Sequence, residues 1–354
     1  MTQTTPITLI IPQDLGGLRL DQALQKLLPE HSRSRLQQWI KDGLVTLEPA
    51  QAVTAKTKVW GGERLQVQVQ PSPDEHAFEA EDIPLDVQYE DEHILVINKP
   101  AGLVVHPAAG NWSGTLLNAL LHHAPVVKDL PRAGIVHRLD KDTSGLLVVA
   151  KTLTAQTSLV RQLQARTVKR EYRAIVWGQV WQNGRIDQPI GRHPHARTKM
   201  AINRNGKPAV TRYEVLERFA VHTYLRCNLE TGRTHQIRVH MQHLKAPLVG
   251  DPVYGLGGIV PLRMMPQHLR DTVLNFGRQA LHAVKLGLIH PASGEFMEWQ
   301  VELPADMKSL LEAMRLVPVD EVDLPFEFEG DMDDDDLDDA YPEDELLDDD
   351  DEID

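Results

Sequence analysis

Cysteine is almost absent from this chain of 354 residues, and Cys227 is its only example. A single thiol excludes a disulfide framework within the chain, and such cysteine usage is typical of the reducing cytosol. No apolar run approaches the roughly 20 residues that a membrane-spanning helix needs, and no basic segment followed by an apolar core begins the chain. We therefore expect a soluble, cytoplasmic protein without a membrane partner.

Metal-binding and cofactor-binding signatures are also missing. The sixteen histidines show no HExxH or paired Cys/His spacing, although His235, His240 and His243 leave metal ligation open as an alternative. The glycine run at residues 255–258 lacks the spacing and the strand–helix context of a dinucleotide-binding loop. We expect no metal and no cofactor. Cys227 lies within a strand-like segment, where a core position is a better interpretation than a nucleophile.

Positive charge is absent from the last 35 residues. Residues 320–354 contain 21 Asp or Glu and no Lys or Arg, so the net charge of −14 conceals a body of +7 over residues 1–319. A basic body favours a polyanionic partner, because lysine and arginine that neutralise phosphates release counterions. The acidic tail is expected to be disordered. Its role is either solubility or occupation of the basic nucleic-acid groove when no nucleic acid is bound.

The length suggests two domains and an extension. The first, over residues 15–75, has a helical apolar pattern at 20–28 and a second helix that Ser32 or Ser34 caps and Gly43 ends. Strand patterns follow at 44–47 and 64–70. The second helix is basic, and its candidate RNA contacts are Arg33, Arg35 and Lys41. A solvated charged face is the alternative interpretation of these cations.

Proline- and acid-rich residues 76–84 are predicted to link this domain to a larger one over residues 85–316. Strand patterns outnumber helical ones in the larger domain, and several strands are joined by connections too short for parallel crossovers. The sequence therefore predicts an α+β fold with a mixed or antiparallel sheet. The strand segments are 86–89, 94–98, 146–151, 172–177, 211–215, 223–229, 283–289 and 298–301. The helical segments are 115–122 with a Ser113 cap, 156–164, 234–244 with a Thr234 cap, and 306–315.

One loop carries a carboxylate among cations. In His137-Arg-Leu-Asp-Lys-Asp-Thr-Ser-Gly145, Asp140 lies beside Arg138 and Lys141 and just before a β-branched, apolar strand that Gly145 allows the chain to enter tightly. A fixed carboxylate in a basic setting is ionised, as a nucleophile or general base must be. A local ion pair in a surface turn is the alternative. Asp142 is best explained by a structural hydrogen bond in the loop.

Two further segments carry candidate groups. In Asn98-Lys-Pro-Ala-Gly102 a strand ends in a turn that offers Lys99 to a cleft. In Gly232-Arg-Thr-His-Gln-Ile-Arg238 a strand breaks and a helix begins, with His235 and Arg238 on one helix face. An arginine in that position is suited to a bidentate clasp of a carboxylate or a phosphate.

The sequence motifs resemble those of two known families, one in each predicted domain. Arg19-Leu-Asp-Gln-Ala-Leu24 followed by Ser32-Arg-Ser-Arg-Leu36 and Gly43 resembles the S4 RNA-binding domain. The three motifs at 98–102, 137–145 and 232–238, in that order, resemble the RluA-type pseudouridine synthases. The combined resemblance covers about residues 15–315. It implies an isomerase that converts uridine to pseudouridine in RNA and uses neither metal nor cofactor.

The resemblance also implies residue roles. Asp140 corresponds to the catalytic carboxylate, Arg238 to the arginine that pairs with it, and Tyr172 to the tyrosine that stacks on the target base. Arg138 corresponds to the residue that fills the gap left by a flipped base. The remaining basic side chains expected to contact RNA in these motifs are His137, Lys99 and Arg233.

The expected partner is large-subunit ribosomal RNA or the pre-ribosomal large subunit, bound by a monomer. An S4-like module favours a large structured RNA, and the resemblance points to uridines of the helix 69 stem-loop in 23S rRNA. Two alternatives stay open. One is the same chemistry on another rRNA site or on tRNA, and the other is a non-catalytic RNA-binding ribosome-assembly factor.

Overall fold

The computed structural model describes residues 6–29, 31–48, 53–69, 78–108, 110–196, 198–256 and 265–317. The acidic tail at 320–354, with its expected disorder, and residues 257–258 of the glycine run lie outside these ranges. The chain forms two compact units, residues 1–75 and 76–354. Among the described residues, no helix has the length and apolar character needed to cross a bilayer.

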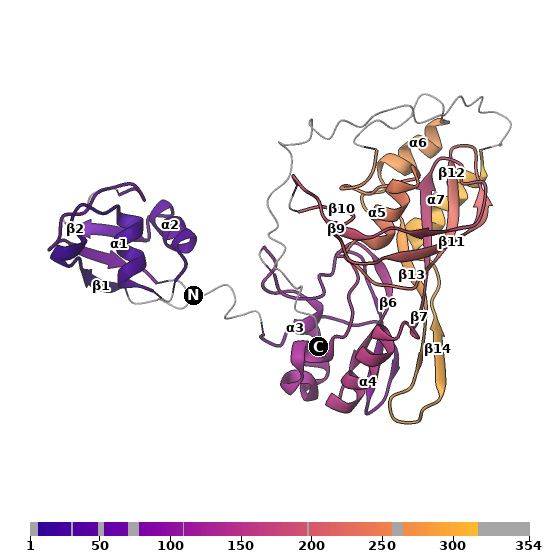
Figure 1. The fold of residues 1–354 in the computed structure, drawn as a ribbon, viewed down its shortest axis with the longest axis horizontal. Coiled ribbons are helices and arrows are strands. Elements are labelled where there is room, and N and C mark those ends of the chain that lie inside the picture. The colour runs from indigo at the N-terminus through magenta and orange to yellow at the C-terminus, as the bar shows by residue number, and fades with distance from the viewer. Residues whose placement is uncertain are drawn as a thin grey trace. The chain divides into compact units, whose positions relative to one another are not determined.

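The first unit packs two helices on a three-stranded antiparallel sheet (Figure 1). In sheet order its strands are β1 (Ile7–Ile10), β3 (Arg64–Val67) and β2 (Val45–Glu48). Its helices are α1 (Leu20–Leu27) and α2 (Arg33–Lys41), with a 3-10 turn at Gln13–Leu15. Ser32 is the cap of α2, and its Oγ accepts a hydrogen bond from the Arg35 amide at 3.3 Å. The predicted helices and strands are present, and β1 is an additional strand that sequence patterning did not indicate.

A nine-stranded mixed sheet forms the second unit, and among its described strand pairs only β6–β13 is parallel. The order is β4-β5-β6-β13-β7-β12-β11-β8, with β14 paired to β13. The strands are β4 (Val87–Glu90), β5 (Ile94–Lys99), β6 (Ser144–Ala150), β7 (Lys169–Trp177), β8 (Gly184–Asp187), β11 (Val210–Arg218), β12 (His222–Leu229), β13 (Leu281–Ile289) and β14 (Phe296–Gln300). Strands β9 (Ile190–Arg192) and β10 (Met200–Ile202) form a separate hairpin. The predicted α+β class is confirmed.

Helices cover both faces of this sheet (Figure 1). They are α3 (Leu116–His123), α4 (Leu153–Gln164), α5 (Gln236–His243), α6 (Gln267–Leu274) and α7 (Ala305–Arg315). Alternate residues of β5 and β6 belong to two different cores, one with α3 and the other with α4. Likewise α5 packs with one face of β7, and α6 and α7 with the other. Burial on both faces explains why β5 and β6 are nearly continuous apolar runs, as is the second half of β7 at residues 174–177.

Helix α4 begins at Leu153, three residues before the predicted start, and the caps of two other helices differ from the sequence prediction. Thr115, not Ser113, caps α3: its hydroxyl oxygen accepts from the Asn118 amide, and the Asn118 side-chain oxygen accepts from the Thr115 amide. Helix α5 begins at Gln236 and has no cap from Thr234. The Gln236 side chain itself reaches back and accepts from the Arg233 amide at 3.0 Å and from the Thr231 hydroxyl at 2.7 Å. The residue before α5, His235, takes a left-handed backbone with φ of 53°.

Candidate active site

The loop that carries Asp140 is held against the ends of β5 and β6. The Thr143 amide donates to the Asp140 carbonyl at 3.0 Å and closes a turn just before β6. Strand β6 then passes so close to β13 that a Cβ at Gly145 would lie 2.2 Å from the Ala283 carbonyl oxygen. Only glycine fits there, and Gly145 also has a positive φ of 119°. The backbone that precedes β6, and with it Asp140, is thereby fixed.

Lys99 lies beneath this loop and not in a cleft. Its side chain is 0% exposed, and its ammonium donates to the carbonyl oxygens of Pro100, Leu103 and Lys141 at 2.8–2.9 Å. Burial lowers the pKa of Lys99 to about 7, against the opposing charge of Asp140. An enclosed ammonium cannot reach RNA, so the predicted RNA contact of Lys99 is corrected. Lys99 instead ties the end of β5 to the Asp140 loop.

His137 has a similar structural position. Its Nε2 accepts a hydrogen bond from the Val148 amide at 3.1 Å, which requires an unprotonated nitrogen. Burial, together with the charge of Arg170, lowers the pKa of His137 to about 3. The imidazole is therefore neutral at physiological pH and anchors the loop to β6. This differs from the cationic RNA contact expected of it.

Asp140 and Arg238 form an ion pair at the centre of the site. Arg238 Nη1 lies 3.1 Å from Asp140 Oδ2, and the Asp140 side chain is 17% exposed. Burial acts to raise the pKa of the Asp140 carboxyl, but His235, Arg238 and Arg138 act in the opposite direction and hold it below its ordinary 3.8. His235 is itself neutral near pH 7, because burial lowers its pKa. At neutral pH the two arginines therefore keep Asp140 ionised.

A second carboxylate, Asp251, fixes the orientation of Arg238. Arg238 Nε and Nη2 donate to the two Asp251 oxygens at 2.7 and 2.9 Å. Asp251 Oδ1 also accepts from the amides of Val253 and Tyr254 at 2.9 and 3.0 Å. Although burial opposes it, the Asp251 hydrogen bonds and the Asp140 charge raise the pKa of Arg238. Sequence patterning did not identify Asp251, because nothing local marks a partner 13 residues away in a loop.

Tyr172 and Arg170 project from the same face of β7, two residues apart. Tyr172 is 6% exposed, and burial raises its pKa to about 12 although the Arg170 charge opposes the shift. Asp140 also acts on Tyr172, so these side chains are electrostatic neighbours. The side chain of Tyr172 is therefore a neutral phenol at physiological pH.

Arg170 is a buried cation that sequence analysis did not single out. It is 9% exposed, and no described residue forms an ion pair or a hydrogen bond with its side chain. Its guanidinium lies over Gly232, where an added Cβ would be 2.5 Å from Arg170 Nη1. An unpaired buried charge is costly, so its retention points to an anionic partner from outside the chain. The only sequence signal was its position two residues before Tyr172.

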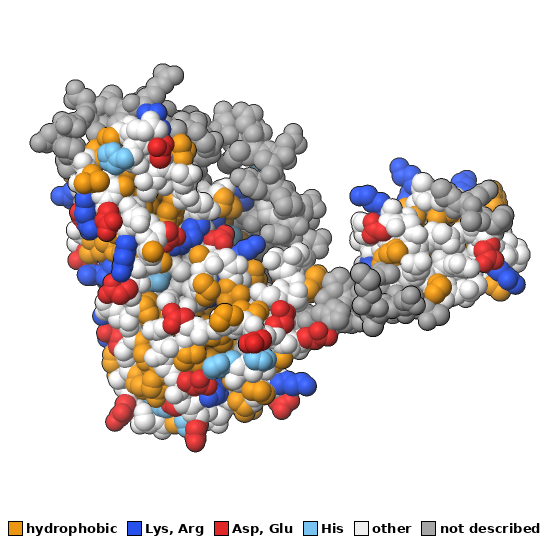
Figure 2. Space-filling view, turned by 180° about the vertical axis from the view of Figure 1, so that it is seen from behind, with side chains coloured by type: hydrophobic (Ala, Val, Ile, Leu, Met, Phe, Trp, Pro, Cys, Tyr) orange, Lys and Arg blue, Asp and Glu red, His pale blue; other side chains and the backbone are white. Residues whose placement is uncertain are grey.

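The remaining residues predicted to contact RNA differ in how far their side chains are exposed to solvent. Arg138 is exposed beside Asp140, whereas Arg233 is half-buried and donates from Nε to the Pro208 carbonyl at 3.3 Å. In the first unit, Arg33 donates to Asp21 at 2.8 Å, Arg35 stacks over Trp39, and Lys41 is exposed. On the face of the molecule in Figure 2, acidic, basic and apolar side chains are interspersed among the described residues. That face does not present the basic body as a single patch.

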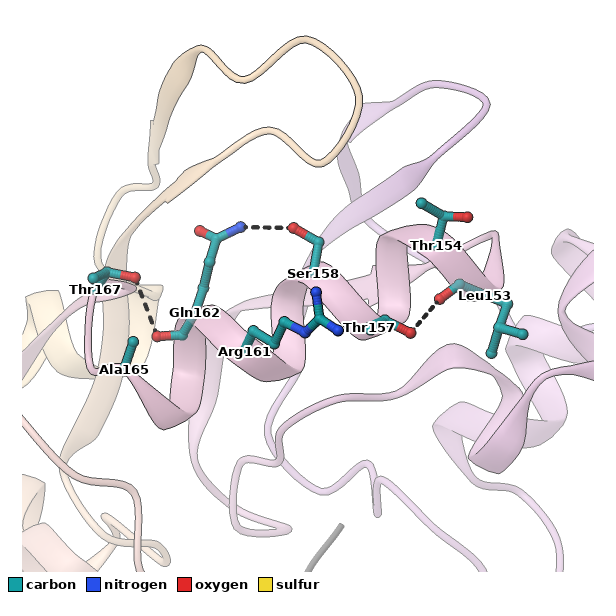
Figure 3. A pocket seen from close by; sticks show the side chains of 8 residues that line it. All are labelled: Leu153, Thr154, Thr157, Ser158, Arg161, Gln162, Ala165 and Thr167. Carbon is teal, nitrogen blue, oxygen red and sulfur yellow. Dashed lines mark hydrogen bonds between the residues drawn. The ribbon is translucent and has the colours of Figure 1, made fainter. Parts of the chain in front are cut away.

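Other candidate sites carry little chemistry. In the described ranges, no group of three or more His, Cys, Asp or Glu could hold a metal ion. His240 uses both ring nitrogens, towards Thr211 Oγ1 and the Gln188 carbonyl. Burial raises the pKa of the Cys227 thiol to about 12, which suits a core residue. A shallow hollow of about 610 Å³ along α4 has Arg161 as its one ionisable side chain and shares no lining residue with the Asp140 site (Figure 3).

Comparisons with known proteins agree with the motifs. Residues 93–243 match the family model for RNA pseudouridylate synthases. The chain is 56% identical over 319 residues to the ribosomal large subunit pseudouridine synthase D of Nitrosomonas europaea, covering 90% of this chain and 91% of that protein. It is 53% identical over 315 residues to the protein of the same name from Escherichia coli strain K12, covering 89% of this chain and 96% of the relative.

A solved structure gives the same result for the fold. The human protein RNA pseudouridylate synthase domain containing 4 aligns with 65% of this chain and 92% of its own length, at 25% identity and a TM-score of 0.52. Identity above one half over nine-tenths of both chains is far more than a shared fold requires. The family that the three ordered motifs indicated is therefore confirmed. This chain belongs to the RNA pseudouridylate synthases.

Proposed function

We propose that this chain isomerises specific uridines to pseudouridine in large-subunit ribosomal RNA and that Asp140 carries the reaction. The observation that supports Asp140 is its ion pair with Arg238 at 3.1 Å, in a site where the side chain is only 17% exposed. The names of the relatives from N. europaea and E. coli support the choice of RNA.

The reaction needs an ionised carboxylate near the ribose. The bond from C1′ to N1 of the uracil breaks, the base turns, and C1′ forms a bond to C5. C5 then loses its proton, and N1 gains one. The Asp140 carboxylate either attacks C1′ or removes the proton on C2′, and both roles require the charged form. The low pKa of Asp140 meets that requirement at physiological pH.

Tyr172 and Arg170 are suited to hold the base while it is detached. The ring of Tyr172 offers an aromatic face for the uracil, and its phenol group is a hydrogen-bonding group close to Asp140. Uracil that leaves C1′ carries negative charge on its nitrogen and carbonyl oxygens. The unpaired guanidinium of Arg170 would stabilise that charge inside a site of low dielectric. These roles explain why a buried cation that pairs with no described residue is retained beside the aromatic ring.

RNA binding is assigned to both units. The S4-like unit at 15–75 would contact phosphates through the basic face of α2, with residues 76–84 as the linker to the catalytic domain at 85–316. A base inside a stem cannot reach the half-buried Asp140, so the target must be flipped out, and the exposed Arg138 would fill the gap. The target would be the helix 69 stem-loop of 23S rRNA, bound by a monomer without a cofactor.

Mapping of pseudouridines in rRNA tests this proposal. Carbodiimide modification and primer extension would be applied to large-subunit rRNA from cells that lack the protein. The helix 69 signals should be missing, and plasmids that encode the wild type, but not Asp140→Asn, should restore them. If every large-subunit signal persists in cells that lack the protein, the substrate is a different RNA. Restoration by Asp140→Asn would contradict the catalytic role.

A further inference from the structure

His235 stands between the Asp140 carboxylate and the hydroxyl of Tyr254. Its Nδ1 lies 2.8 Å from Tyr254 Oη, and its Nε2 lies 4.0 Å from Asp140 Oδ1. The imidazole thus faces the oxygen that Arg238 does not hold, since Arg238 Nη1 contacts Oδ2. Only 15% of the His235 side chain is exposed, so solvent does not compete freely for either nitrogen.

The hydrogen bonds around Tyr254 determine the tautomer of His235. Tyr254 Oη already accepts a hydrogen bond from the Met200 amide at 2.8 Å. Burial raises the pKa of Tyr254, so its hydroxyl keeps its proton and has one bond to donate. The described acceptor within reach is His235 Nδ1. A neutral imidazole that accepts at Nδ1 carries its proton on Nε2, and that N–H is directed at Asp140.

Contacts of Asp251 and Tyr254 hold both His235 and Arg238 in place. Asp251, which clamps Arg238, also accepts from the backbone amide of Tyr254 at 3.0 Å. The Arg238 guanidinium packs over the Tyr254 ring at 5.0 Å, and the rings of His235 and Tyr254 meet edge to face at 5.5 Å. His235 is also placed by its left-handed backbone at the start of α5. The two groups that approach Asp140, Arg238 and His235, therefore share the support of Asp251 and Tyr254.

We propose that His235 is a positioning residue for the reaction, which presents Nε2–H to Oδ1 of Asp140 while Arg238 holds Oδ2. This inference rests on the proposed function of Asp140. A gap of 4.0 Å is longer than a hydrogen bond, but catalytic contacts commonly shorten when substrate fills the site. One donor on each oxygen fixes the rotation of the carboxylate and leaves further lone pairs for the ribose. Tyr254 acts through His235, because its hydroxyl selects the tautomer of the His235 ring.

Two substitutions at position 235 distinguish positioning of Asp140 from a need only for the left-handed backbone at this residue. Glutamine places an amide N–H close to the position of imidazole Nε2, whereas the shorter asparagine reaches only as far as Nδ1. Asparagine, however, adopts left-handed backbone angles more readily than glutamine. A residue needed only for the φ of 53° would therefore be replaced better by asparagine than by glutamine. Positioning of Asp140 predicts the opposite order.

The experiment compares wild type, His235→Asn, His235→Gln and Tyr254→Phe in single-turnover release of tritium from C5-labelled RNA. His235→Asn should lose about tenfold or more in maximal rate, as expected when a hydrogen bond to a charged group is removed, with unchanged half-saturating RNA concentration. His235→Gln should retain most of the rate, and Tyr254→Phe should lie between them. Wild-type activity of His235→Asn, or equal loss in both variants, would overturn the proposal.

Nitrogen-15 NMR of the histidine rings supplies a readout that needs no turnover. The wild-type protein should show His235 protonated at Nε2, and Tyr254→Phe should show a mixture of tautomers. An Nδ1–H tautomer in the wild type would overturn the proposal even if the enzyme is active. Absence of pseudouridine formation by the wild type would instead contradict the proposed function, and the two failures are therefore distinguishable.

Discussion

Asp251 grips Arg238 through both carboxylate oxygens, at 2.7 and 2.9 Å, and leaves Nη1 of the guanidinium for Asp140. Asp251→Asn should therefore disturb the site although Asp251 does not touch Asp140. The substitution removes one charge from a buried network, so the free energy of unfolding should fall by on the order of 3 kcal/mol. The maximal rate should fall as well, because Arg238 loses its fixed orientation.

Denaturant unfolding and single-turnover kinetics measure these two effects. Asp271→Asn is the matched control and should change neither quantity, because Asp271 is exposed on α6 and, within the described ranges, its side chain bonds only to nearby Gln267. If Asp251→Asn matches that control in both assays, Asp251 does not support the site.

The pH profile tests the charge state of Asp140. Because its pKa is held below 3.8, the carboxylate is ionised throughout the range from pH 5 to pH 8, and the rate should not fall on acidification within that range. The depressed pKa of Asp140 stabilises the fold at any pH above the pKa of this group in the unfolded chain. That stabilisation is lost only as the pH falls through the pKa in the folded protein, which lies below 3.8. Arg238→Gln removes a charge that lowers the pKa of Asp140, while burial still raises that pKa. The acid limb of the pH–rate profile of this variant should therefore move to higher pH.

Arg238→Lys should also be impaired, since lysine keeps the charge but loses the planar fork that binds Asp251 and Asp140 together. An acid limb in Arg238→Gln at the wild-type position would mean that Arg238 does not set the charge of Asp140. Full activity of Arg238→Lys would direct attention to another cation, with Arg233 the next candidate.

Arg170 should show opposite effects on stability and activity. Arg170→Met keeps an apolar side chain of similar length and removes an unpaired buried charge, so the free energy of unfolding should rise by about 1 kcal/mol or more. The rate of pseudouridine formation should fall, because the departing uracil loses a cation. Arg170→Lys should retain part of the rate. A stabilised Arg170→Met with wild-type turnover would exclude Arg170 from the reaction.

The first unit offers an independent prediction. Asp21 is fully buried and accepts hydrogen bonds from Arg19, Arg33 and Gln37 at 2.6–3.1 Å, which joins α1 to α2. Asp21→Asn should lower the free energy of unfolding of this unit by about 1–3 kcal/mol, the range for hydrogen bonds to charged groups. It should also weaken RNA binding, because Arg33 is no longer oriented. The exposed Asp14→Asn is the control, and equal behaviour of the two variants in calorimetry would contradict this role.

Sequence patterning predicted the elements whose burial is regular and missed those defined by distant contacts. The helical faces of α1 and α2 follow from apolar periodicity, and the buried strands β5, β6 and β7 follow from short apolar runs. The hairpin β9–β10 has no such periodicity, and the start of α5 depends on a hydrogen bond from the Arg233 amide to the Gln236 side chain, which no local propensity encodes.

The site divides in the same way. Asp140 and Arg238 were predicted from their motifs and Tyr172 from the family resemblance, but Asp251 and Tyr254 reach the site from a separate loop, and Arg170 is marked only by burial. Lys99 was misassigned because its charge suggested a surface, whereas three carbonyl groups enclose it. Hydrogen-bond acceptors supplied by the backbone are invisible in a sequence.

The most direct test of the account is tritium release from C5-labelled large-subunit rRNA by wild type and Asp140→Asn, alongside RNA affinity and thermal unfolding. Asparagine retains the size of the side chain and removes the charge that pairs with Arg238. We expect that Asp140→Asn folds, binds the RNA with near wild-type affinity and releases no tritium above background. Tritium release by folded Asp140→Asn at a rate close to that of the wild type would contradict it.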